Sequence, residues 1–290
     1  MKKIIIILIT VVSGIHVSAQ TQEYSAYLGL GYSPLSYQLK QDASRSGGFG
    51  GDVVGLGYTY LFETIERVTE SGTVQRMQWG IHSGIGFGFY NARATVSSGK
   101  TSSDPQIDDE NDRFRLHTTI SGYEEKQNTL FLNIPVMAQL HLSDKYYAKA
   151  GFKAGIPLIR NYSAKNVIIT NEPEYIDIGA PLRDPNNLKF VGFGAFEKSP
   201  KGKFDLGFTM MLALEAGMRF RVFSDLTLYA GVYFDYGLNN SLKTTKDTFV
   251  AYNITDPENF TINSVLTDYT DKAKIMAVGV TVRVAMPQWW

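Results

Sequence analysis

The stretch from Leu130 to Leu158 alternates between apolar and polar or small residues on both sides of a short polar turn. Even-numbered positions are apolar from Leu130 to Leu142 and again from Tyr146 to Leu158, whereas odd-numbered positions include Asn133, Gln139, His141, Lys149, Gly151, Lys153 and Gly155. Successive side chains of a β-strand point to opposite faces, so this period of two predicts a hairpin with one apolar face. Such a face fits either the core of a soluble sheet or the lipid-facing wall of an outer-membrane barrel.

The same alternation recurs in eight segments along the chain. They are Ala26–Tyr32, Val54–Phe62, Met77–Phe89, Leu130–Leu142, Tyr146–Leu158, Phe204–Val222, Leu226–Tyr236 and Met276–Val284. Each reaches about the 9–11 residues that a tilted strand needs to cross a bilayer. Bacterial outer-membrane barrels have an even number of strands, and this count agrees with that rule.

The connections between these segments alternate in length. The shorter ones are Glu63–Thr73, Ser143–Lys145 and Phe223–Asp225, and the longer ones are Gln38–Gly50, Asn91–Asn128, Asn161–Lys203 and Asn239–Lys272. Outer-membrane barrels have short periplasmic turns and longer extracellular loops, whereas a soluble meander has no reason to sort its connections in this way. The sequence therefore predicts an all-β fold, a transmembrane antiparallel up-and-down β-barrel of eight strands with long extracellular loops.

A ten-stranded barrel is the alternative. It would use Val167–Ile169 and Leu188–Phe196, which lie inside the third long connection. Neither stretch keeps an apolar face long enough to span a bilayer. We expect them to form a hairpin or a cover above the membrane.

Residues 1–19 have the features of a secretory signal peptide. Lys2 and Lys3 precede an apolar run, and Val17-Ser18-Ala19 fits the small-residue cleavage pattern. The run is shorter than the roughly 20 residues of a spanning helix. We therefore expect residues 20–290 to form one outer-membrane β-barrel domain.

Composition narrows the classes of function. The chain has 28 basic and 28 acidic residues, which gives no basic field for binding nucleic acid. It has no cysteine, which excludes disulfides and thiolate metal sites.

Two parts of the sequence resemble a known family. The hairpin LNIPVMAQL to GFKAGIPL and the ending GVTVRV (Gly279–Val284) are similar to the PorT-like or OmpA-like eight-stranded outer-membrane β-barrel proteins of Bacteroidetes-type bacteria. The resemblance covers the chain from about Tyr24 to the C-terminus. It implies insertion by the barrel assembly machinery, whose recognition signal is an aromatic-ended last strand; Trp290 fits this signal, although Pro287 interrupts the strand before it. Some members of the family support protein secretion to the cell surface.

An eight-stranded barrel is just wide enough to be filled by its own side chains, so we do not expect an open diffusion pore. Charges in such a narrow space must be paired or hydrogen-bonded, which predicts a lumen charge network. Its predicted members are Lys149, Lys153, Asp205, Glu215, Arg219, Arg221, Asp235 and Arg283. Counting from the turns places Lys153 and Glu215 at a similar height, so we expect both in the network. A structural plug is favoured over a gate or an ion path.

The sequence shows no constellation of nucleophile, base and orienting group, so we predict no catalytic residue and no cofactor. The acidic run Asp108–Asp112 lacks the spaced ligands and the turn glycine of a calcium loop, and we predict no metal site there. The long loops are rich in aromatic residues, which either bind a partner or pack the loops on one another. The candidates are Phe114, Tyr123, Tyr175, Phe193, Phe196, Tyr252 and Phe260.

These patterns predict a non-enzymatic integral outer-membrane protein whose surface loops serve binding or assembly, and the resemblance implies a component associated with secretion. The alternatives are a narrow channel and a lipid-modifying outer-membrane hydrolase. We expect the termini to be periplasmic and the long loops extracellular. The expected partners are outer-membrane lipid, the barrel assembly machinery during insertion and a protein at the loops, with no nucleic acid.

Overall fold

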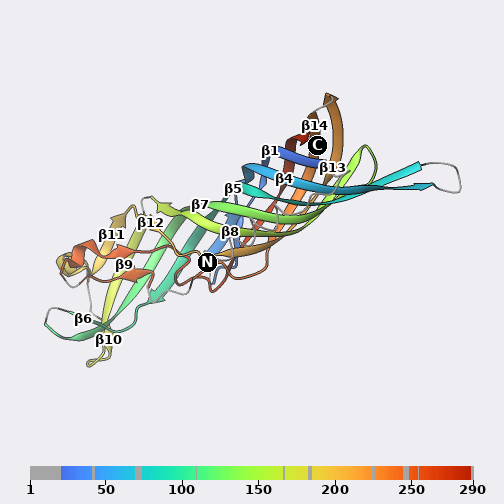
Figure 1. The fold of residues 1–290 in the computed structure, drawn as a ribbon. Helices are drawn as coiled ribbons and strands as arrows, with labels where there is room; N and C mark the ends of the chain where they lie inside the picture. Colours follow the sequence, from blue (N-terminus) through green and yellow to red (C-terminus); the bar gives the residue numbers. More distant parts are fainter. Residues whose placement is uncertain are drawn as a thin grey trace.

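The computed structural model describes residues 21–288 apart from residues 41–42, 69–73, 109, 166, 182–184, 224–225, 244–247 and 254. The predicted signal peptide and Trp290 lie outside the described residues. The described chain is an elongated molecule built almost entirely of β-strands (Figure 1). Its helical elements are the short 3-10 helices η1 (Pro185–Val191) and η2 (Pro257–Asn259). Within this part of the chain, no helix has the length and apolar character needed to span a bilayer.

Eight long strands form a closed antiparallel ring. In order around the ring they are β1 (Thr21–Tyr32), β4 (Phe49–Val68), β5 (Val74–Ser102), β7 (Arg113–His141), β8 (Tyr146–Ala164), β13 (Thr209–Phe223), β14 (Leu226–Gly237) and β17 (Ala273–Gln288). The ring closes because the first strand pairs with the last, with Leu28 of β1 opposite Val282 of β17. The predicted eight-stranded antiparallel architecture is confirmed.

The alternation in the sequence decides which side chains face out of the ring. Leu28 and Val280 are 63% and 60% exposed, whereas Tyr27 and Arg283 are 9% and 1% exposed. A soluble protein buries apolar residues and exposes charges, and this wall does the opposite. The exposed apolar side chains form a band around the ring that includes Leu28, Leu30, Leu56, Ile81, Ile85, Val136, Phe152, Leu214, Val232, Val280 and Val282.

One end of the ring carries the shorter connections, and we name it the short-turn end. At the turn between β7 and β8, the backbone N–H of Lys145 donates to Ser143 Oγ at 3.2 Å, and that of Leu142 donates to the carbonyl of Tyr146 at 3.0 Å. β4 and β5 run past the ring as a projecting hairpin in which Val68 pairs with Val74 (Figure 1). The predicted connection Glu63–Thr73 therefore begins as strand.

The opposite end, which we name the long-loop end, is more ordered than the sequence predicted. β5 and β7 continue beyond the ring and pair as far as Ser102 with His117. The prediction of a loop over Asn91–Asn128 is therefore wrong for most of its length, because the alternation continues there and buries Ala92, Ala94 and Val96.

Further strands extend this sheet. β9 (Val167–Tyr175) pairs with β7, and β11 (Gly194–Lys198) pairs with β9. The two stretches of the ten-strand alternative thus meet at the long-loop end, where Phe196 lies opposite Ile169, and neither belongs to the ring. The remaining strands are β2 (Leu35–Tyr37), β3 (Ala43–Gly47), β6 (Gln106–Ile107), β10 (Ala180–Pro181), β12 (Lys201–Lys203), β15 (Val250–Ala251) and β16 (Thr261–Ile262).

The sixth predicted segment begins too early. Strand β13 starts at Thr209, and the residues before it do not belong to the wall. Phe204 and Leu206 are buried, and Leu206 forms an isolated bridge with Leu242 from the last long connection. Their apolar character serves contacts at the long-loop end and not the outer face of a strand.

Two hydrophobic layers fill the long-loop end. The first, which we name the mouth layer, lies across the ring and includes Leu35, Tyr37, Tyr90, Phe131, Leu206, Met211, Leu266 and Ile275. The second, which we name the tip core, lies farther out and includes Phe114, Leu116, Ile120, Tyr123, Val167, Ile169, Phe193, Phe249 and Val265. The long connections therefore form a folded extension of the barrel with its own buried core.

Candidate functional site: the barrel interior

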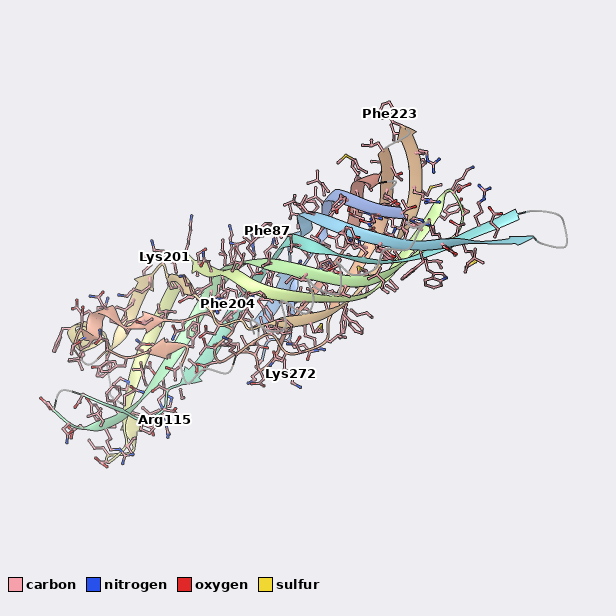
Figure 2. The ribbon with its side chains drawn as sticks, in the orientation of Figure 1. Phe87, Arg115, Lys201, Phe204, Phe223 and Lys272 are labelled. Carbon is pink, nitrogen blue, oxygen red and sulfur yellow. The ribbon has the colours of Figure 1, made fainter. Side chains whose placement is uncertain are left out.

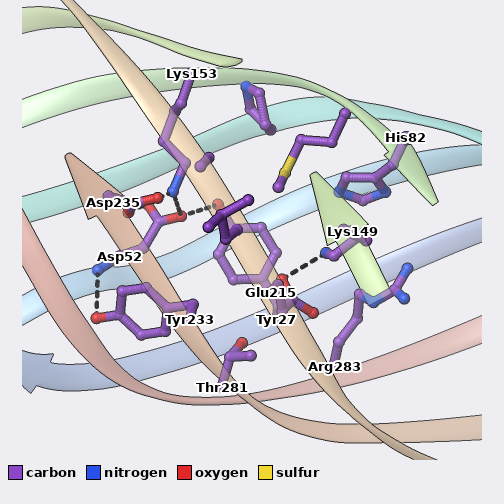
Figure 3. A pocket seen from close by; sticks show the side chains of 14 residues that line it. Tyr27, Asp52, His82, Lys149, Lys153, Glu215, Tyr233, Asp235, Thr281 and Arg283 are labelled. Carbon is purple, nitrogen blue, oxygen red and sulfur yellow. Dashed lines mark hydrogen bonds and ion pairs between the residues drawn. The ribbon is translucent and has the colours of Figure 1, made fainter. Parts of the chain in front are cut away.

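A lysine between two carboxylates occupies the middle of the barrel interior (Figure 3). Lys153 Nζ lies 2.8 Å from Asp52 Oδ2 and 2.8 Å from Asp235 Oδ2. Asp52 shares the even numbering of the outward residues of β4, but a register shift between Asp52 and Val54 turns it inward. Gly51 precedes this bulge with a φ of +108°, a conformation that a residue without a Cβ adopts readily.

Other inward side chains complete the hydrogen bonding of Asp52. Tyr27 donates its hydroxyl to Asp52 Oδ2 at 3.2 Å, and Asn133 donates its amide to Asp52 Oδ1 at 2.9 Å. The backbone N–H of Asp52 donates to the hydroxyl of Tyr233 at 3.4 Å (Figure 3). A buried ion pair is tolerated only when its remaining polar atoms are satisfied, and this cluster meets that condition for Asp52.

A second pair lies nearer the short-turn end. Lys149 Nζ is 2.6 Å from Glu215 Oε2, and the hydroxyl of Tyr147 donates to Glu215 Oε1 at 2.7 Å. The expectation that Lys153 and Glu215 lie at the same height is wrong, because Glu215 is the register partner of Lys149 and Lys153 is that of Met211. Counting from the turns ignores the stagger between neighbouring strands that barrel closure requires.

Arg283 lies among polar and aromatic groups from several strands. Its Cζ is 3.9 Å from the centre of the Tyr229 ring, a cation–π contact. Its Nη2 donates to Gln139 Oε1 at 3.1 Å, and its Nη1 donates to Thr59 Oγ1 at 3.4 Å. The hydroxyl of Tyr229 in turn donates to Glu23 at 2.9 Å. Thus four predicted members in addition to Lys153 face the lumen, namely Lys149, Glu215, Asp235 and Arg283.

The other three predicted members lie away from the two ion-pair clusters. Asp205 precedes β13, its side chain is 48% exposed, and it contacts Arg160 at 3.5 Å. Arg221 is exposed beside the register shift that ends β13. Arg219 lies at the short-turn end, where its Nη1 donates to His141 Nδ1 at 2.9 Å. Asp205 and Arg221 are therefore not part of the network, because the inward alternation does not hold before β13 or beside its terminal bulge. Arg219, which lies opposite Tyr229, points inward and contacts the network at the short-turn end.

The network also contains residues that the sequence reading missed. Asp52 could not be found from periodicity, because its bulge reverses its side. Glu23, Tyr27, Asn133, Tyr147 and Tyr229, in contrast, all occupy odd positions of their strands, and the same alternation places them inward. A search for polar and tyrosine residues on the inward face would have found them.

Little space remains inside the barrel. A cavity of about 30 Å³ lies between the two ion-pair clusters, and Lys149, Lys153, Glu215 and Asp235 line it. This volume holds only a few water molecules. The mouth layer covers the long-loop side of the same space with packed apolar side chains. The interior is filled, as an eight-stranded barrel allows.

Comparison with known proteins agrees with this geometry. A family model described as an outer membrane protein beta-barrel domain matches residues 19–243. The chain belongs to this family. No curated protein matches the chain. As an outer membrane β-barrel, it is located in the outer membrane, and its exposed apolar band is the surface that meets lipid.

The outer membrane β-barrel carries a further buried acid outside the lipid-facing band, at the base of the tip core. Glu125 of β7 is fully buried and accepts hydrogen bonds from Ser264 Oγ at 2.6 Å, Gln127 Nε2 at 2.7 Å and the backbone N–H of Val265 at 2.9 Å. Burial raises the pKa of the Glu125 carboxyl above its ordinary value, and these hydrogen bonds offset only part of that effect. Glu125 thereby fixes the last long connection to β7.

The aromatic residues considered for loop binding lie in or against the tip core. Phe114, Tyr123, Phe193 and Phe260 are buried, and the rings of Tyr175, Phe196 and Tyr252 pack against that core. The prediction of an exposed aromatic surface is therefore corrected in favour of its alternative, in which the loops pack on one another. The continuing strands allow this, because they bring alternate side chains to one inner face.

The acidic run serves its own loop. Asp108 Oδ1 accepts hydrogen bonds from the backbone N–H groups of Glu110 at 3.1 Å and Asp112 at 2.8 Å. The hydroxyl of Tyr175 donates to Asp108 Oδ2 at 3.2 Å. Among the residues that the structure describes, no group of three or more His, Asp or Glu side chains is arranged to hold a metal ion.

Strand pairing brings together one set of groups with the chemistry of a catalytic triad, which the sequence reading did not find. Ser102 Oγ lies 2.7 Å from His117 Nδ1, and His117 Nε2 lies 2.7 Å from Glu174 Oε2. These residues come from β5, β7 and β9 and lie on the outer surface, where the His117 and Glu174 side chains are 39% and 32% exposed. Neither they nor Ser102 line either of the two cavities described for this chain. The three side chains form a cross-strand hydrogen-bond network on the outer surface.

Proposed function

We propose that this outer membrane β-barrel is a non-enzymatic anchor that presents its long-loop end to a macromolecular partner at the cell surface. In this arrangement the long-loop end is extracellular, and both termini are periplasmic. The barrel holds the protein in the membrane, and the folded extension provides the surface for binding or assembly.

The tip core is the observation that carries this proposal. Sixteen buried hydrophobic residues pack together beyond the ring, on strands that continue from the barrel wall. Strands that run directly from the wall into this extension hold it rigidly. A preformed surface loses less conformational entropy on binding than mobile loops do, which suits a binding role.

The filled interior favours an anchor over a channel. The ion pairs of Lys149 and Lys153 lie in the path through the ring, and the mouth layer covers it. A conducting path would need these groups to separate, which leaves buried charges unpaired at a cost of several kcal/mol.

The surface geometry favours a binding protein over a lipid-modifying hydrolase. The Ser102, His117 and Glu174 cluster is open to solvent, where charge–charge interactions are weak. His141, another candidate base, is buried beside Arg219 and Tyr229 inside the barrel, away from the lipid surface.

The resemblance to PorT-like proteins of Bacteroidetes-type bacteria supports a role associated with secretion. The signal-peptide pattern of residues 1–19 supports export, followed by insertion through the barrel assembly machinery. A protein component of a secretion assembly is therefore the partner that we propose at the long-loop end.

Epitope tags test both the orientation and the partner. One tag is placed in the Asp108–Asp112 turn of the long-loop end, and its matched control is placed in the Ser143–Lys145 turn of the short-turn end. We expect antibodies to label intact cells only for the first tag, and extraction in mild detergent to recover a stoichiometric protein partner. Labelling of the second tag alone would contradict the orientation, and recovery of the barrel alone would contradict the assembly role.

A further inference from the structure

The outward face of β5, β7, β8 and β12 changes character in three successive rows above the lipid-facing band. Strand pairing sets Phe89, Leu130 and Ile159 side by side in the first row. The second row consists of Asn91, Asn128, Asn161 and Lys203. The third row consists of Arg93, Lys126, Ser163 and Lys201. The wall thus changes from apolar to amide to basic over two row spacings.

The four cations of these rows are available on the surface. Lys126, Lys201 and Lys203 are exposed. The side chain of Arg93 is 50% exposed, and its Nε lies 3.4 Å from Glu124 Oε1. An exposed pair of this kind is worth roughly 0–1 kcal/mol, so Arg93 can readily exchange this partner for another anion.

The height of the cations above the band identifies what they meet. Successive outward residues are about 7 Å apart along a strand, and barrel strands are tilted by about 40°, so the basic row lies about 10 Å above the row of Phe89. A bilayer extends some 5–8 Å per side beyond its hydrocarbon core, so the backbone of the basic row lies just above the headgroup layer and its long side chains reach that layer. Lysine and arginine side chains at such a boundary bend toward the charged layer, which brings them to the headgroups.

We propose that Arg93, Lys126, Lys201 and Lys203 form a docking surface for the phosphate groups of a glycolipid in the outer leaflet. The inference rests on the proposed orientation, in which the long-loop end is extracellular. Lysine and arginine bind phosphate oxygens through charge-assisted hydrogen bonds. The acyl chains of the same lipid lie along the apolar row below, so one molecule contacts both parts of the surface.

Two other cations at this end have carboxylate partners. Arg160 lies 3.5 Å from Asp205, and Lys40 lies 2.7 Å from Asp271. The four-strand surface carries four cations and Glu124 as the anion that contacts Arg93, which gives it an excess of positive charge. This excess complements a phosphorylated headgroup.

The test uses the purified full chain in detergent micelles, with bisphosphorylated lipid A as the probe and dephosphorylated lipid A as its comparison. The variant Lys126→Gln/Lys201→Gln/Lys203→Gln removes three charges from the docking surface. The matched variant Arg113→Gln/Arg115→Gln/Lys189→Gln removes three exposed charges farther toward the tip, where Figure 2 labels Arg115. Heat-modifiable migration on gels verifies that each barrel is folded.

We expect the wild type to prefer the phosphorylated lipid, and the docking-surface variant to bind it about tenfold more weakly or worse. The matched variant should stay within about twofold of the wild type. Equal binding by the wild type and the docking-surface variant would overturn the proposal, as would equal binding of the two lipids. Competition by millimolar inorganic phosphate would identify a free-anion site and overturn the lipid assignment. Because the assay is done in micelles, its outcome is independent of the tag experiment that tests orientation.

Discussion

At the scale of single residues, the stability of the barrel interior depends on groups that satisfy one another. Lys153 contacts two carboxylates, and Asp52 also accepts hydrogen bonds from Tyr27 and Asn133. These ion pairs add little net stability, because the cost of removing the charges from water offsets most of the attraction between them. Their consequence is that removing Lys153 leaves both carboxylates without their cation.

Replacing Lys153 with methionine tests this dependence. The substitution keeps a long side chain but leaves Asp52 and Asp235 without their cation, and we expect the free energy of unfolding to fall by about 3–5 kcal/mol. Urea titration of the folded protein in lipid vesicles measures the change. The exposed Lys126→Met control should change it by less than about 0.5 kcal/mol. Adding Asp235→Asn to Lys153→Met should recover part of the loss; a further loss would show that the charges act independently.

Glu125 makes stability depend on pH in a defined direction. Burial raises the pKa of this carboxyl in the folded protein above the value in the unfolded chain, so the folded state binds the proton more tightly. The stability that this tighter proton binding adds to the folded state is therefore complete below the unfolded pKa of about 4.3. It is lost as pH rises through the higher folded pKa of Glu125. We expect wild-type stability to fall across this window relative to Glu125→Gln, in unfolding titrations at several pH values. The exposed neighbour Glu124→Gln should keep the wild-type slope, and a parallel profile for Glu125→Gln would contradict the assignment.

At the scale of strands, the sequence predicts much of the fold because the alternation of two depends on each strand alone. The hairpin from Leu130 to Leu158 illustrates this, since its apolar positions face outward as the pattern requires. Register between strands depends on the closure of the whole barrel. Counting from the turns therefore placed Lys153 at the height of Glu215, although its register partner is Met211.

The bulge at Asp52 marks the other limit of prediction from sequence. Periodicity places Asp52 on the outer face, and a single irregularity in β4 moves it into the centre of the ion-pair network. The extension of β5 and β7 was missed for a different reason, because Asn91–Asn128 contains many polar residues although its alternate positions are buried. Both features depend on neighbouring strands that a single sequence does not reveal.

The variant Gly51→Ala tests the role of this bulge. The Cβ of this variant would clash with the hydroxyl oxygen of Tyr233. Its backbone would also have to keep a φ of +108°, which is unfavourable for a residue with a Cβ. Gly122 has a φ of +63° with no atom within 4 Å of a Cβ, so Gly122→Ala is a matched control that carries backbone strain alone. We expect urea titration to show a loss of about 1–2 kcal/mol for the control and about 3 kcal/mol or more for Gly51→Ala. Equal losses would mean that the Tyr233 contact adapts without cost.

At the scale of the whole molecule, polar and apolar layers alternate from the barrel to the tip. The ion-pair clusters fill the ring, the mouth layer covers them, Glu125 and its partners follow, and the tip core lies beyond. Each layer uses strands that pass through the one before it, most visibly β5 and β7 (Figure 1). This continuity joins the membrane anchor and the surface extension into one structure.

The layered interior predicts that the barrel does not conduct even when part of its cover is removed. In planar bilayers we expect no steady conductance from the wild type. A variant in which a short Gly-Ser linker replaces residues 242–271 loses Leu266 from the mouth layer, Ser264 from the Glu125 cluster and six of the sixteen tip-core residues. It keeps both ion-pair clusters inside the ring. We expect this variant to remain closed, because the cavity between the ion-pair clusters has space for only a few water molecules. A porin inserted in the same bilayers is the positive control. Steady current from the wild type would contradict the filled interior, and current from the deletion variant alone would show that the mouth layer, and not the charge network, closes the barrel.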